Sequence, residues 1–203
     1  MKSLGVKKFH YLLLASSIEA VLIIIALLSD TVLAGHLGGA LNDEPLSAMN
    51  IIIPIVSIMT CISCTLSFGT KFFYNKALGE ENKEHSDEIF GMGLFTSIVT
   101  GIITFMIVKN GINLYFDFLK TDDIIKFYFY EYFRYFQFDL LLTPLLLFLS
   151  GMVYNDGDEL IANCANFMNI IGNVILSAVF AFYFKMGISG IALGTLLKDI
   201  FQY

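Results

Sequence analysis

Two acidic side chains, Glu19 and Asp30, interrupt the first long apolar stretch of the sequence. Their separation of 11 residues corresponds in an α-helix to three turns with about 20° left over, so both project from nearly one face. Charges inside a bilayer are tolerated chiefly when they face a bundle interior, a partner or a water-filled pathway. These acids could therefore exchange a proton or bind a cation in a cavity, although a hydrogen-bonded structural acid, or an interfacial position for Asp30, would explain the same spacing.

A stripe of amide and hydroxyl side chains runs through a later apolar stretch. Its members are separated by 3, 3, 4 and 4 residues and are Asn163, Asn166, Asn169, Asn173 and Ser177. Helical spacing gathers them within about a third of the helix circumference, a face that should avoid lipid. The stripe could coordinate a cation or hold ordered water in a cavity, and hydrogen bonding between helices would explain it equally well.

Aromatic residues occupy nine of the twelve positions from 127 to 138. An aromatic belt at the membrane interface is one explanation. The alternative is a pocket for flat, cationic organic compounds, which ring faces attract. For that pocket we select Tyr132, Tyr135, the nearby acid Asp139 and, from the polar stripe, Asn169.

The sequence lacks the residue sets that a metal site or an enzyme active site would need. Cys61, Cys64 and Cys164 lie in apolar stretches, without a second cysteine pair or a histidine cluster to complete a metal site. The histidines at 10, 36 and 85 fall near the ends of apolar stretches or in polar segments, so no convergent nucleophile and base are evident. We therefore expect no enzyme, no metal site and no cofactor other than a coupling ion, a proton or a sodium ion.

The composition indicates that lipid is the solvent of the elements that carry these residues. Hydrophobic residues make up 57% of the chain, charged residues 15%, and the mean hydropathy is +0.74. A soluble domain would be about 45–50% apolar and about 25% charged. The net charge of −6 comes largely from acids in short polar segments between apolar runs, which indicates solvated loops and gives no sign of nucleic-acid binding.

Six apolar stretches follow one another, at residues 9–34, 46–74, 89–108, 124–154, 160–184 and 188–203. Because about 20 helical residues cross a bilayer, and because backbone amides must be paired in lipid, we expect an all-α, polytopic membrane helix bundle. It would contain five complete transmembrane helices and a truncated sixth. The whole chain, 1–203, would form one transmembrane lobe that is incomplete at its carboxyl end.

Lysines suggest an orientation. Lys2, Lys7 and Lys8 precede the first stretch, which is too long and too polar for a signal peptide. They favour a cytoplasmic amino terminus by the positive-inside rule. Lys76 and Lys83 would then be internal, whereas Lys109, Lys120 and Lys126 would lie at or near an external connection and weaken the assignment.

Several motifs resemble those of the multidrug and toxic compound extrusion (MATE) transporters. The run Ser29 to Gly38 is similar to the Asp-Thr-x-x-x-Gly-x-x-Gly ending of that family's first helix, and Ala48 followed by Ile53-Pro54-Ile55 is similar to the opening of its second. Residues 77–82, Ala-Leu-Gly-Glu-Glu-Asn, resemble the internal loop of the family. The Asn-Asp-Gly of residues 155–157 and the Gly-x-x-Gly-x-Ala-x-x-Thr of 187–195 resemble its later turns.

The resemblance implies a transporter of twelve helices in two six-helix lobes that exports drugs or other organic, often cationic, compounds across the plasma membrane in exchange for protons or sodium ions. Such a protein works by alternating access, and this chain would need a second six-helix lobe. By position, Asp30 resembles the first-helix acid of the family's ion site, Asn173 its fifth-helix asparagine and Thr195 its sixth-helix hydroxyl. Ser177 stands where many members have aspartate when residues 155–195 are aligned without gaps, whereas Asn173 stands there when the asparagines of the stripe are aligned. Neither alignment restores the acid.

The missing carboxylate favours proton coupling through Asp30, with Glu19 as an auxiliary acid. Two alternatives remain open. A lipid-linked oligosaccharide flippase of the same superfamily would use basic intramembrane residues, for which Lys71 and Arg134 are the candidates. The chain could also be a structural fragment that transports nothing.

Overall fold

The computed structural model describes residues 17, 21, 24, 25, 28–38, 43–155 and 159–202. This part of the chain contains helices and no strands: residues 28–38 are helical, and five labelled helices follow. These are α2 (Glu44–Gly79), α3 (Lys83–Leu119), α4 (Asp123–Asn155), α5 (Glu159–Ala178) and α6 (Ile188–Gln202), with a π-helical turn (Val179–Tyr183) between the last two. The predicted all-α helix bundle is thereby confirmed.

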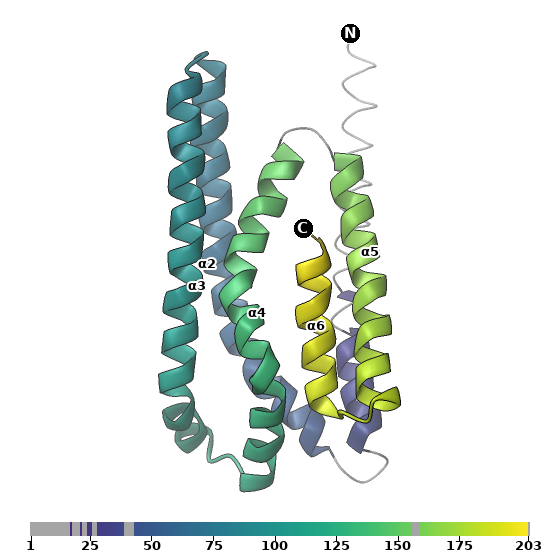
Figure 1. The fold of residues 1–203 in the computed structure, drawn as a ribbon. Helices are drawn as coiled ribbons and strands as arrows, with labels where there is room; N and C mark the ends of the chain where they lie inside the picture. Colours follow the sequence, from purple (N-terminus) through teal and green to yellow (C-terminus); the bar gives the residue numbers. More distant parts are fainter. Residues whose placement is uncertain are drawn as a thin grey trace.

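The helices run side by side, with α4 between the α2–α3 pair and the α5–α6 pair (Figure 1). In this arrangement α4 packs against α2, α3 and α6, and α6 packs against α5. The central position of α4 matters for function, because it brings the aromatic run and Asp139 next to the helices that carry the polar stripe and Thr195.

Three helices of the described residues, α2, α3 and α4, are long and apolar enough to cross a membrane. Their outward faces carry large apolar side chains, including Leu114 at 76% exposure and Phe118 at 82%. Because lipid is the solvent that such faces require, the chain is a multi-pass membrane protein. Residues 167–183 form a shorter apolar helical segment, while most of the predicted first span lies outside the described residues.

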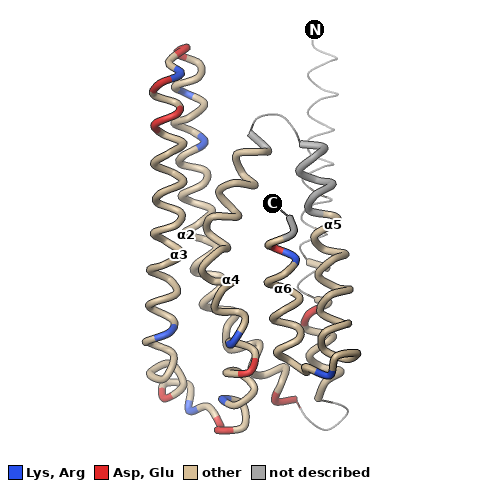
Figure 2. The backbone as a smooth tube through the Cα atoms, in the orientation of Figure 1, with Lys and Arg blue, Asp and Glu red and all other residues tan. Residues whose placement is uncertain are grey.

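Helices α2 and α3 extend beyond the apolar stretches that predicted them. They contain 36 and 37 residues, or about 55 Å of helix each, against a hydrocarbon core of about 30 Å. Charged residues gather at the two ends of this pair (Figure 2). Hydropathy marks only the part of a helix that lipid surrounds, so the solvated ends were outside the predicted ranges.

The connection between α2 and α3 is a tight turn. Helix α2 ends at Gly79, Glu81 has a positive φ of 57°, and the side chain of Asn82 caps α3 by accepting a hydrogen bond from the His85 backbone N–H at 3.1 Å. Asparagine is a preferred residue at this position because its side-chain oxygen satisfies an unpaired helical N–H. The loop expected from residues 77–82 is therefore present.

One face of the aromatic run belongs to the core. Phe129, Tyr132, Phe133 and Phe136 are buried, and the rings of Phe129 and Phe133 stack at 5.4 Å. The spacing of three and four residues places these rings on one side of α4. An interfacial belt or an open aromatic pocket therefore describes this face less well than helix packing does.

Candidate functional site

The polar cluster around Asp30 joins three separate segments of the chain. Asn173 on α5 donates from Nδ2 to the Asp30 carboxylate at 3.1 Å, and Thr195 on α6 donates from Oγ1 to Asp30 Oδ2 at 3.4 Å. Ser177 Oγ lies 3.3 Å from Asn173 Oδ1. Four of the five residues predicted for the ion site are thus in mutual contact, and the fifth, Glu19, lies outside the described residues.

The cluster is held inside the bundle rather than at its surface. Asn173 and Ser177 are fully buried, and Thr195 is buried as well. Thr195 follows the first residue of α6 by seven positions, which places it about 10 Å along the helix. Asp30 itself is half-buried. The buried amide and hydroxyl groups must find their partners within the protein.

Glycines allow the two helices that carry these donors to approach closely. A Cβ atom added to Gly194 would lie 2.5 Å from both the backbone nitrogen and the hydroxyl of Ser177, and one added to Gly190 would lie 2.6 Å from the Ala181 nitrogen. Gly187 provides the turn into α6 with a φ of +62°. Small residues at a helix contact let backbones approach.

The arrangement has the chemistry of a proton or monovalent-cation site. Two carboxylate oxygens, an amide oxygen and a hydroxyl oxygen converge, and the Asp30 charge is also within electrostatic range of Lys198 and Asp199 on α6. Oxygen ligands of this kind suit hard cations, and a single carboxylate can carry one proton. Within the described residues, no group of three histidine, cysteine or acidic side chains could hold a metal ion.

The residues chosen for a substrate pocket differ in burial and in their neighbours. Tyr132 is 4% exposed and stacks on Phe136 with ring centroids 5.0 Å apart, whereas Tyr135 is half-buried with the Arg134 guanidinium over its ring. Asp139 is buried, and Thr143 Oγ1 lies 3.4 Å from its carboxylate while donating to its backbone carbonyl at 2.8 Å. These three side chains lie on α4, and their role in substrate binding stays a prediction.

Asn169 contacts two residues that the sequence reasoning missed. Its Nδ2 atom donates to the Lys198 carbonyl at 3.2 Å and to Asp199 Oδ1 at 3.5 Å. One signal was available: Asp199 follows Thr195 by four residues, so both lie on one face of α6. The site therefore continues for one turn beyond the predicted set.

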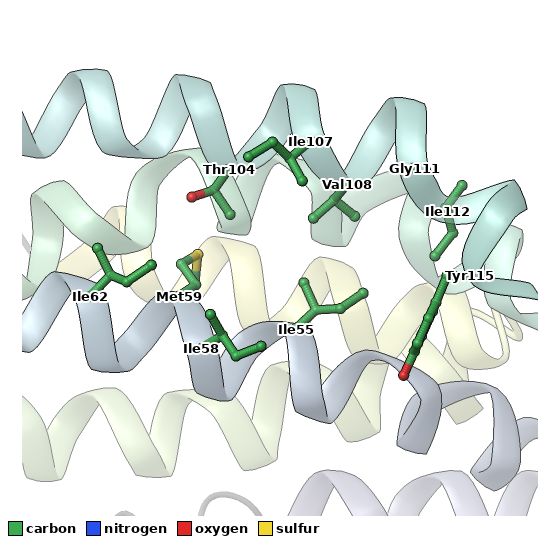
Figure 3. Close-up of a pocket in the computed structure, with 10 residues that line it drawn as sticks. All are labelled: Ile55, Ile58, Met59, Ile62, Thr104, Ile107, Val108, Gly111, Ile112 and Tyr115. Atoms are coloured by element: carbon green, nitrogen blue, oxygen red, sulfur yellow. The ribbon is translucent and has the colours of Figure 1, made fainter. Parts of the chain in front are cut away.

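A separate pocket of about 290 Å³ lies between α2 and α3 (Figure 3). Its lining residues are apolar apart from Thr104 and the Tyr115 hydroxyl, and none is charged: Ile55, Ile58, Met59, Ile62, Thr104, Ile107, Val108, Gly111, Ile112 and Tyr115. None of the residues predicted to bind ions or substrate lines this pocket. Its walls match hydrocarbon rather than a charged headgroup.

Comparison with solved structures identifies the fold. The chain matches a crystal structure of a MATE point mutant with a TM-score of 0.83, 20% identity, and coverage of 93% of this chain and 42% of the other. It also matches an inward-facing multidrug resistance MATE family transporter of the MOP superfamily, with a TM-score of 0.78, 21% identity, and coverage of 88% and 40%. It also matches a MOP superfamily transporter from Pyrococcus furiosus, with a TM-score of 0.82, 20% identity, and coverage of 93% of this chain and 41% of the other.

The chain thus spans about two-fifths of the length of these structures. No curated protein sequence matches it. The MatE family model, however, matches residues 15–183, which is most of the chain. Together with the shared fold, this match settles the family predicted from the motifs: the chain belongs to the MatE family.

Proposed function

We propose that the chain forms one lobe of a proton-coupled antiporter that exports organic compounds, cationic ones among them, across the plasma membrane. The observation that carries this proposal is the contact of Asp30 with Asn173 and Thr195, which come from three helical segments. A change in the charge of this carboxylate alters its hydrogen bonds to all three helical segments. Protonation would weaken its hold on the donors, and the helices could then shift relative to one another.

A proton is preferred to sodium because the described cluster contains one carboxylate. The Ser177 hydroxyl occupies the place where the family resemblance suggests a second acid, and it contacts Asn173 Oδ1 at 3.3 Å. A sodium ion would be compensated by Asp30 alone, in a buried setting where charge compensation matters strongly. One proton on Asp30 neutralises the cluster completely.

Transport itself would require a second six-helix lobe, because alternating access depends on the movement of one lobe against another. The cavity for substrate would then lie between the lobes, and the α4–α5–α6 side of this chain would border it. The amino terminus would be cytoplasmic.

The test is substrate efflux from proteoliposomes under an imposed pH gradient. This chain alone is compared with a version completed by a second lobe, using a panel of organic cations. Gradient-driven efflux from the completed protein only is the expected result. If neither form moves any compound of the panel, drug export is contradicted, and lipid-linked oligosaccharide flipping is the next activity to assay.

A further inference from the structure

A second acidic side chain lies buried in the bundle near Asp30. Asp139 on α4 is 7% exposed, and its Oδ2 atom lies 3.4 Å from Thr143 Oγ1, whose hydroxyl donates to the Asp139 backbone carbonyl at 2.8 Å. The other oxygen, Oδ1, is buried and finds no hydrogen-bond donor among the described residues. A buried carboxylate oxygen without a donor is costly, so a proton bound at this carboxyl group would stabilise it.

The neighbour of this acid is another carboxyl group. Asp199 on α6, which packs against α4, lies within hydrogen-bonding reach of Asp139. Asp199 Oδ1 in turn accepts from Asn169 Nδ2 at 3.5 Å and lies 3.8 Å from Lys198 Nζ, and the side chains of this ion pair are each 17% exposed. Amide, ammonium and hydroxyl groups therefore surround the two acids, but none of them donates to Asp139 Oδ1.

The charges in this group do not balance. Two carboxylates face one ammonium group, that of Lys198, which leaves one negative charge uncompensated inside a membrane protein. Two carboxylates within hydrogen-bonding reach are both acceptors and repel each other. One proton bound between them would remove the excess charge and provide the missing donor in a single O–H···O bond.

We propose that Asp139 and Asp199 share a proton and form a second proton-binding position, adjacent to Asp30. Its role in transport rests on the proposed proton coupling, but the binding itself does not. The helical spacing supports the arrangement: Asn169 precedes Asn173 by four residues and Asp199 follows Thr195 by four. Asn173 and Thr195 thus lie beside Asp30, and Asn169 and Asp199 lie one helical turn away, with Asp199 next to Asp139.

Tyr132 is within electrostatic range of both positions. Its ring is buried, and the charges of both Asp30 and Asp139 act on it. Asp139 is acted on by Asp199, Lys198 and Thr143, while Asp30 is acted on by Lys198 and Asp199. These shared partners couple the two positions, so a proton on the acid pair changes the field at Asp30.

The experiment is infrared spectroscopy of the full chain in lipid bilayers, titrated with pH in H₂O and D₂O. A shared proton gives a protonated-carboxyl C=O absorption that shifts in D₂O. We expect Asp139→Asn and Asp199→Asn each to remove the same band, which is the signature of a pair. The matched control is Asp117→Asn, which changes an exposed acid on α3 and should leave that band in place.

Circular dichroism checks the fold of each variant, and if one does not fold, the other still tests the assignment. A wild-type spectrum without any such band, or a band that survives in the folded variants, overturns the proposal. Saturable binding of tetraphenylphosphonium that Asp139→Asn abolishes, without a carboxyl band, would instead assign the pair to a cationic substrate. Because this measurement involves no transport, the pair can be verified even when the completed protein exports nothing.

Discussion

Asp30 depends on side chains that are remote in sequence but adjacent in space. The donors of Asn173 and Thr195 reach its carboxylate at 3.1 and 3.4 Å, and the two donors are themselves linked, with Thr195 Oγ1 at 3.3 Å from Asn173 Oδ1. Polar networks in a low-dielectric interior are sensitive to each member, because a donor left without its partner is penalised. Single substitutions at these positions should therefore change ion-coupled efflux by the completed transporter.

The first prediction concerns Asp30→Asn in the completed transporter. We expect pH-driven efflux to fall to the level of protein-free vesicles, because an amide cannot bind and release the coupling proton. The measurement is efflux of an organic cation under an imposed pH gradient. Asp117→Asn, an exposed acid on α3, should transport normally. Full gradient-driven transport by Asp30→Asn would remove this residue from the coupling mechanism.

The second prediction concerns the coupling ion. Ser177→Asp adds a carboxylate next to Asn173, at a position that is fully buried, and two carboxylates compensate a sodium ion better than one. We expect efflux by the completed variant to acquire a dependence on a sodium gradient. Ser177→Asn, similar in size but uncharged, should not acquire it. Sodium-driven efflux by the unmodified protein would contradict the preference for protons.

At the scale of the elements, the approach of α5 and α6 decides the geometry of the site. Ser177 Oγ reaches the Ile191 carbonyl at 3.3 Å across this contact, and the Thr195 hydroxyl bonds the same carbonyl at 3.1 Å. The π-helical turn of residues 179–183 and the positive φ of Gly187 bring the chain back so that α6 packs along α5. A wider spacing would draw Thr195 away from Asn173 and Asp30.

The third prediction tests this close approach. Gly194→Ala would place a Cβ atom 2.5 Å from the Ser177 backbone nitrogen, and overpacking of this kind costs about 1–3 kcal/mol. Gly172→Ala on α5, where a Cβ atom meets nothing within 4 Å, is the matched control. We expect a lower Tm by circular dichroism only for Gly194→Ala. Equal Tm values for both variants would show that α5 and α6 can move apart without loss of stability.

On the scale of the whole molecule, this chain is shorter than the transporters that share its fold. It spans about 42% of the MATE mutant structure, although 93% of the chain itself is matched. Within this chain, Asp30 contacts Asn173 and Thr195 from two other helices. A pathway between two lobes would additionally require the second lobe, and this dependence is tested by the efflux comparison above.

The fourth prediction concerns orientation. The α2–α3 and α3–α4 connections lie at opposite ends of the bundle (Figure 1). Glu81→Cys and Asp122→Cys, both at exposed positions, are introduced separately after the three native cysteines have been replaced by serine. With a cytoplasmic amino terminus, an impermeant maleimide should label only Asp122→Cys in intact cells and both variants after permeabilisation. The reverse pattern would place the amino terminus outside.

The sequence by itself determined the class of the molecule and the members of its first polar cluster. Hydropathy and length predict membrane helices because lipid imposes both on any spanning segment. The periodicity of the polar stripe and the family motifs selected Asp30, Asn173, Ser177 and Thr195, and these four residues are in contact in the structure. Their role in coupling stays a prediction.

The tertiary structure alone decided which residues meet across helices. Periodicity assigns a side chain to a face of its own helix, but the neighbour of that face depends on how the helices pack. The interaction of Asp139 with Asp199 therefore became evident only from the packing of α4 against α6. For the same reason, the burial of Phe129, Tyr132, Phe133 and Phe136 on one side of α4 became evident only from the position of α4 between two helix pairs.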